Sequence, residues 1–69
     1  MSVTVGRIDH SQKAGGKVLV VGHTRWRVEL TIRKPTRAGY REEFFELEPD
    51  EVPRLKELLD LALTRVEKQ

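Results

Sequence analysis

The chain has 69 residues, too few for more than one domain, and its formal net charge is +2. It has no cysteine, which excludes disulfides, thiolate zinc sites and cysteine catalysis. No apolar run approaches the roughly 20 residues of a membrane span, and residues 1–10 lack the apolar core of a signal peptide. We therefore expect a single soluble, cytoplasmic domain over residues 1–69, with no metal, no cofactor and no membrane contact.

Three segments in the first half of the chain predict strands. Residues 2–9 are rich in β-branched side chains, and residues 17–21 are apolar on both pleat faces. Residues 25–33 alternate without a break, with Trp26, Val28, Leu30 and Ile32 on one side and Arg25, Arg27, Glu29, Thr31 and Arg33 on the other. Period two over nine residues predicts a half-buried strand. On this pattern Trp26 belongs to the core, and three arginines share the opposite face.

The second half of the chain predicts one more strand and one helix. Residues 40–48 alternate less cleanly, with Phe45 and Leu47 inward and Tyr40 and Phe44 outward. Pro49 marks a helix start, and Pro53 leaves two interpretations: a helix from near Val52, or a separate turn at 49–52. The helical pattern runs to about Lys68.

The leucines of this helix exceed what one small sheet can cover. Val52, Leu55, Leu59, Ala62 and Val66 form one stripe at helical spacing, and Leu58, Leu61 and Leu63 fall outside it. We predict an α+β fold, a four-stranded antiparallel curled sheet followed by one C-terminal helix. We expect Leu58, Leu61 and Leu63 to form a homodimer interface.

Charge is distributed unevenly along the chain. Residues 1–41 hold nine bases and two acids, a balance of +7, and residues 42–69 hold four bases and nine acids, a balance of −5. This asymmetry predicts a basic face for a polyanion and an acidic region elsewhere. The alternative is that opposite charges meet within the chain or across subunits and cancel.

Arginine pairs bidentately with phosphates, and binding of a single strand also needs aromatic platforms for the bases. The candidate nucleic-acid-binding residues are therefore Arg25, Arg27, Arg33, Lys34, Arg37, Arg41, Tyr40, Phe44 and Lys17. The sequence contains no Ser/His/Asp set and no phosphate-binding P-loop, so we expect a protein that is not an enzyme.

Several short motifs resemble the single-stranded-DNA-binding domain of the transcriptional coactivator family called positive cofactor four. Residues 27–33 (RVELTIR) are similar to the family's basic-apolar strand ending in Ile-Arg, residues 45–51 (FELEPDE) to its helix start, and residues 55–58 (LKEL) to the helix that follows. A second register, which matches residues 16–20 (GKVLV) to the family's Gly-Lys-Val-Leu-Ile, competes with the first. Two aromatic positions of the family fall on Thr24 and near Thr36 here.

The resemblance implies a homodimer that binds single-stranded or melted DNA between its sheets, with the helices forming the dimer interface. It also implies that Arg25, Arg27 and Arg33 contact the DNA backbone. We expect a sequence-independent binder of single-stranded DNA or RNA, because phosphate contacts carry little sequence information. We also expect it to be nucleoid-associated, with a role in transcription or DNA maintenance and a possible protein partner there. Two alternatives remain: a small chromatin-like protein that binds duplex DNA, and a protein-interaction subunit that docks through its helix.

Overall fold

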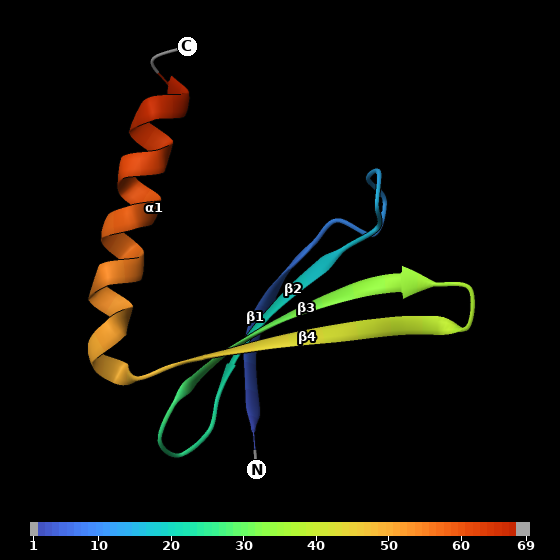
Figure 1. The fold of residues 1–69 in the computed structure, drawn as a ribbon, viewed down its shortest axis with the longest axis horizontal. Helices are drawn as coiled ribbons and strands as arrows, with labels where there is room; N and C mark the ends of the chain where they lie inside the picture. Colours follow the sequence, from blue (N-terminus) through green and yellow to red (C-terminus); the bar gives the residue numbers. More distant parts are fainter. Residues whose placement is uncertain (1, 68–69) are drawn as a thin grey trace.

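The computed structural model describes residues 2–67 and has the expected α+β architecture. Four antiparallel strands, β1 (Val3–Asp9), β2 (Val18–His23), β3 (Val28–Thr36) and β4 (Gly39–Leu47), lie in the order of the chain in one curled, open sheet. A 3-10 turn, η1 (Pro49–Glu51), leads into helix α1 (Val52–Glu67) (Figure 1). Both interpretations of Pro53 hold in part, because a separate turn precedes a helix that begins at Val52.

The third strand begins three residues later than predicted. The Thr24 amide donates a hydrogen bond to the Arg27 carbonyl over 2.8 Å, and the Thr24 hydroxyl accepts the amides of Trp26 and Arg27 at 3.2 and 3.1 Å. A threonine side chain bonded to nearby amides competes with the sheet ladder. The segment from Thr24 to Arg27 is therefore a tight loop, although its sequence alternates like a strand.

The prediction that Trp26 is a core residue is wrong for this reason. Its side chain projects from the loop between β2 and β3, and 71% of the residue is exposed. Val28, Leu30 and Ile32 lie on one face of β3, as the alternation predicted, although Ile32 is 39% exposed.

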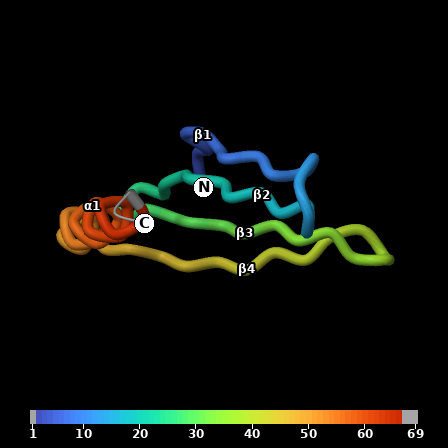
Figure 2. The backbone as a smooth tube through the Cα atoms, turned by 90° about the horizontal axis from the view of Figure 1, so that it is seen from above, coloured from blue at the N-terminus to red at the C-terminus, as the bar shows by residue number. Residues whose placement is uncertain are grey.

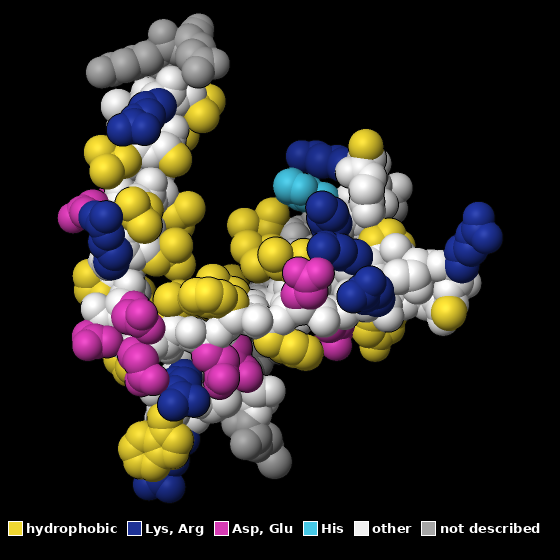
Figure 3. Space-filling view, in the orientation of Figure 1, with side chains coloured by type: hydrophobic (Ala, Val, Ile, Leu, Met, Phe, Trp, Pro, Cys, Tyr) yellow, Lys and Arg dark blue, Asp and Glu magenta, His cyan; other side chains and the backbone are white. Residues whose placement is uncertain are grey.

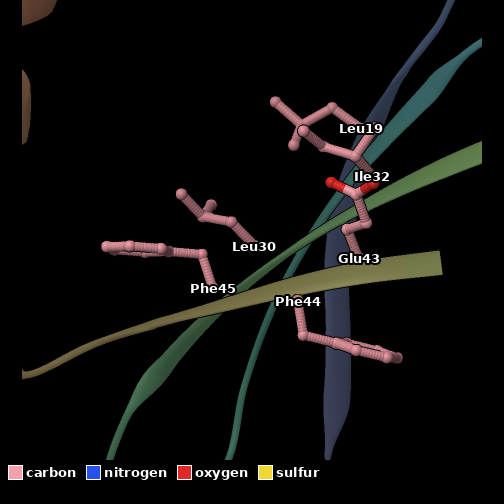
Figure 4. A pocket seen from close by; sticks show the side chains of 6 residues that line it. All are labelled: Leu19, Leu30, Ile32, Glu43, Phe44 and Phe45. Carbon is pink, nitrogen blue, oxygen red and sulfur yellow. The ribbon is translucent and has the colours of Figure 1, made fainter.

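The sheet has two different faces. One, which we call the groove face, turns toward α1, and its residues Ile8, Leu19, Val21, Val28, Leu30 and Leu47 line an open apolar groove of about 380 Å³ with Val52, Leu55, Lys56 and Leu59 of the helix. The other, the outer face, carries Thr31, Arg33, Tyr40, Glu42, Phe44 and Glu46. Figure 4 shows this alternation. Phe44 points to the opposite side of the sheet from the five groove-face residues Leu19, Leu30, Ile32, Glu43 and Phe45.

The helix stands beside the sheet instead of covering it. Within residues 2–67, α1 packs closely only against η1, and seen from above it lies at one end of the sheet (Figure 2). Leu47 is the one buried apolar side chain of the described residues. The open shape gives a radius of gyration of 14.1 Å, against about 11 Å for a compact chain of this length.

Candidate nucleic-acid interface

Arg33 lies on the outer face, as predicted, but its guanidinium group is occupied. Its Nε and Nη2 donate hydrogen bonds to Glu42 Oε2 over 3.1 and 3.0 Å, across the β3–β4 pair. The same guanidinium lies 4.6 Å from the ring centroid of Tyr40, a cation–π contact. Arg33 therefore joins a carboxylate and an exposed aromatic ring on one surface.

Arg27 is compensated in the same way. It lies just before β3, and its Nε donates to Glu48 Oε1 over 3.0 Å, while its Nη1 lies 3.8 Å from Glu46 Oε1. The expectation that Arg25, Arg27 and Arg33 share one strand face is corrected, because Arg25 and Arg27 lie in the loop before β3 and only Arg33 lies on the outer face. Opposite charges from the two halves of the chain meet across β3 and β4, because the acids of residues 42–48 lie opposite the bases of residues 27–34.

Arg25 differs from the other two arginines. It lies in the loop between β2 and β3, and its guanidinium carbon is 5.0 Å from the centroid of the Trp26 ring. No carboxylate of residues 2–66 forms an ion pair with it. The loop thus presents an exposed indole with a cation packed on one side.

Tyr40 and Phe44 lie where the sequence predicted them. Both are on the outer face of β4, where Tyr40 is 59% exposed and Phe44 is 67% exposed. Phe45 and Leu47 point to the groove face, also as predicted, although Phe45 is 63% exposed there because nothing in the described part of the chain covers it. The sequence missed the exposure of the Trp26 ring, and the Thr24 side chain was the signal for it.

The remaining candidates lie on the other face or at the hairpin tip. Lys34 donates a hydrogen bond to Glu43 over 2.8 Å on the groove face, where Arg41 is the cross-strand partner of Lys34. The pKa of the Glu43 carboxyl is below its usual value because of the hydrogen bond from Lys34 and the positive charges of Arg41 and Lys17. Arg37 occupies the turn between β3 and β4. Figure 3 shows Lys and Arg side chains gathered over the part of the sheet farther from the helix.

The predicted dimer residues are all exposed on α1. Leu58, Leu61 and Leu63 have exposed fractions of 45%, 50% and 55%, and Leu59 and Val66, which we expected to cover the sheet, reach 60% and 68%. Within the residues that the structure describes, nothing covers these apolar side chains of the helix.

Two further observations concern metals and membranes. No group of three or more His, Asp or Glu side chains within residues 2–66 is arranged to hold a metal ion. None of the described helical residues forms a segment long and apolar enough to cross a bilayer. Comparisons with protein-family profiles, with curated proteins and with solved structures find no match to this chain.

Proposed function

We propose that this chain is a homodimeric, non-catalytic protein that binds single-stranded nucleic acid with little sequence preference. The observation that carries the proposal is that three aromatic rings outside the groove face, Trp26, Tyr40 and Phe44, are exposed, and that two of them hold an arginine guanidinium against the ring. Single strands are bound by stacking of bases on aromatic side chains next to cationic groups, with cation–π contributions from arginine. We place it in the cytoplasm, at the nucleoid, with a role in transcription or DNA maintenance.

The homodimer is supported by the surface of the isolated chain. Its accessible area is 6221 Å², whereas a compact monomer of 8.0 kDa has about 4,450 Å². Removing the excess from two chains buries about 3,500 Å² in total, which lies within the range of obligate homodimers. A second copy of the chain is therefore an occupant of sufficient size for the groove and the exposed leucines.

Trp26 is the only tryptophan of the chain, so its fluorescence reports directly on the proposed function. We expect the emission of a solvent-exposed indole in the free protein and strong quenching on addition of short oligothymidine. Unchanged emission at saturating oligothymidine would remove Trp26 from the interface. Duplex DNA of the same length is the comparison that tests the chromatin-like alternative.

Phe44→Leu provides a second test on the outer face. Leucine keeps apolar bulk but loses the flat ring, so we expect affinity for oligothymidine to fall by about 1–3 kcal/mol with no change in salt dependence. Thermal unfolding of the variant provides the control, because a residue 67% exposed contributes little to packing. Wild-type affinity for this variant would contradict a stacking role.

A protein-interaction subunit is the second candidate, and one observation favours it. Three of the candidate cations already have partners without any nucleic acid. Arg33 and Lys34 pair with glutamates on β4, and Arg27 pairs with Glu48, the residue directly after β4. A folded protein that binds no oligothymidine at low salt would move this candidate to first place.

A further inference from the structure

A row of basic side chains crosses the sheet on the groove face. The Lys34–Arg41 pair is direct, and the Val18–Arg33 pair places Lys17 beside Lys34. The His10 amide donates a hydrogen bond to the Lys17 carbonyl over 2.9 Å, which extends the row to the edge of β1. Residues opposite one another in neighbouring strands share a face. We call His10, Lys17, Lys34 and Arg41 the basic row.

This arrangement is unfavourable for the free protein. Like charges directly opposite one another in a sheet are destabilising. Glu43 bonds Lys34, and no carboxylate of residues 2–66 forms an ion pair with Lys17 or Arg41. One register position away, on the outer face of the same two strands, Arg33 lies opposite Glu42 and the charges cancel. The basic row therefore retains an uncompensated positive charge.

The position of the basic row leaves it accessible. It lies beyond the apolar row formed by Ile8, Leu19 and Ile32, at the end of the sheet farther from α1, and His10, Lys17 and Arg41 are exposed. His10 and Lys17 also border a shallow hollow of about 280 Å³. Strands are spaced about 4.8 Å apart, so four side chains form a strip about 14 Å long.

The acids of this chain are poorly placed to compensate the basic row in a dimer. Four acids of residues 42–48 lie on or next to β4, and all of them already pair with Arg27, Arg33 or Lys34. Residues 52–69 hold four bases and three acids, so α1 of a second copy brings no net negative charge. An anion from outside the chain is the better counterpart.

We propose that the basic row holds consecutive phosphates of a polyanionic chain, and that the phosphodiester backbone of a single-stranded nucleic acid is its ligand. The proposal rests on the proposed function and assigns backbone contact to the groove face instead of to Arg27 and Arg33, whose guanidinium groups already bond glutamates. Lys17 and Arg41 are the main contacts because they have no carboxylate partner among the described residues. Lys34 contributes once a phosphate competes with Glu43.

The test is the salt dependence of binding to labelled oligothymidine, measured by fluorescence anisotropy. On a single strand, each phosphate that a cation neutralises adds about 0.7 to the logarithmic salt slope. We therefore expect Lys17→Gln/Arg41→Gln to lower the slope by about 1.4. Arg7→Gln/Lys13→Gln removes the same net charge at positions outside the basic row and should leave the slope unchanged. Equal effects of the two double variants would overturn the proposal.

Glu43→Gln tests the same row in the opposite direction. Removing this carboxylate frees Lys34, so we expect tighter binding and a slope steeper by about 0.7. Glu46→Gln, on the outer face of the same strand, is the matched control and should leave the slope unchanged. Wild-type slope for Glu43→Gln would count against the proposal.

Three outcomes separate this proposal from its alternatives. In the first, oligothymidine quenches the Trp26 fluorescence of the wild-type protein while Lys17→Gln/Arg41→Gln keeps the wild-type salt slope. In that case the basic row is rejected and the proposed function stands. If wild-type protein binds inorganic polyphosphate but not oligothymidine, the row takes a polyanion and the nucleic-acid ligand is rejected. If the double variant dissociates into monomers on light scattering and binds as before, the row is a subunit contact and the proposal fails.

Discussion

Arg25 and Arg27 lie two residues apart in one loop, and their partners decide how each acts on a polyanion. Arg27 holds Glu48 at 3.0 Å, whereas Arg25 packs on Trp26. A cation that already has a counterion adds little to the salt dependence of binding. The two arginines are therefore a matched pair for separating charge from phosphate contact.

We predict that Arg25→Gln lowers the logarithmic salt slope of oligothymidine binding by about 0.7. Arg27→Gln should lower it by clearly less, since Glu48 loses its partner at the same time. Anisotropy titrations over a range of salt concentrations measure both slopes. Identical slopes for the two variants would show that the ion pair with Glu48 has no influence on binding.

Gly22 is required by the close approach of β1 to β2. A Cβ atom at this position would lie 2.6 Å from the Val3 carbonyl oxygen, a backbone atom that cannot move without shifting the strand. We predict that Gly22→Ala destabilises the fold by about 1–3 kcal/mol, as overpacking does. Denaturant unfolding measures the effect. Gly6→Ala is the control, because a Cβ at Gly6 meets nothing within 4 Å, and equal stability of the two variants would contradict the prediction.

At the scale of elements, the start of the helix depends on Glu51. Its carboxylate accepts the backbone amide of Glu48 over 2.8 Å, and its own amide donates to the Glu48 carbonyl over 2.9 Å. Reciprocal bonds of this kind satisfy amides that a helix start otherwise leaves without partners. The contact fixes where β4 ends and where the helical segment begins.

We predict that Glu51→Ala lowers the free energy of unfolding by about 1 kcal/mol. Glu51→Gln should lose less than half of that, because an amide oxygen still accepts the Glu48 amide. Thermal unfolding followed by circular dichroism compares the three proteins at one concentration. A glutamine variant as unstable as the alanine variant would assign the effect to the charge near the helix N-terminus.

The sequence predicted the elements well because their signals are local. Alternation of apolar residues located β3 and β4, and it set the inward parity of Phe45 and Leu47. Pro49 and the acids after it located the helix start. The exception was Trp26, because a strand and a tight loop can share the same alternation and only the hydrogen bonds of Thr24 separate them.

The candidate site was predicted less well because it depends on pairing between strands. Lys34 and Arg41 are close only because the turn at residues 37–38 sets the β3–β4 register, and Lys17 joins them through β2. Neither register follows from residue types alone. The grouping of Arg25, Arg27 and Arg33 on one strand face failed because Arg25 and Arg27 lie in the loop before β3. The glutamate partners of Arg27 and Arg33, on β4 or directly after it, depend on strand pairing.

At the scale of the whole molecule, the helix has more apolar surface than its own sheet can cover. The side of α1 that faces the groove includes Leu59. At 3.6 residues per turn, Leu63 lies about 40° from Leu59 around the helix, Leu58 about 100° and Leu61 about 160°. Leu63 therefore belongs with the groove side, and Leu58 and Leu61 would stay exposed even if α1 closed onto its own sheet.

A homodimer covers both sides of the helix, whereas closure within one chain covers only one. We predict that the wild-type protein is a dimer by light scattering at micromolar concentration. Its melting temperature should rise with protein concentration, as it does when folding is coupled to association. A single-chain mass with a concentration-independent melting temperature would contradict the dimer.

The leucines farthest from the groove side give the most specific test of the dimer. We predict that Leu58→Glu/Leu61→Glu yields a weakly folded or unfolded monomer, because a carboxylate in an apolar interface loses its hydration without gaining a partner. Thr64→Glu adds a charge to the same helix on its polar side, so it should keep the wild-type mass and melting temperature. A double variant that stays folded as a monomer would mean that α1 closes onto its own sheet, and the open groove would then be filled from within the chain.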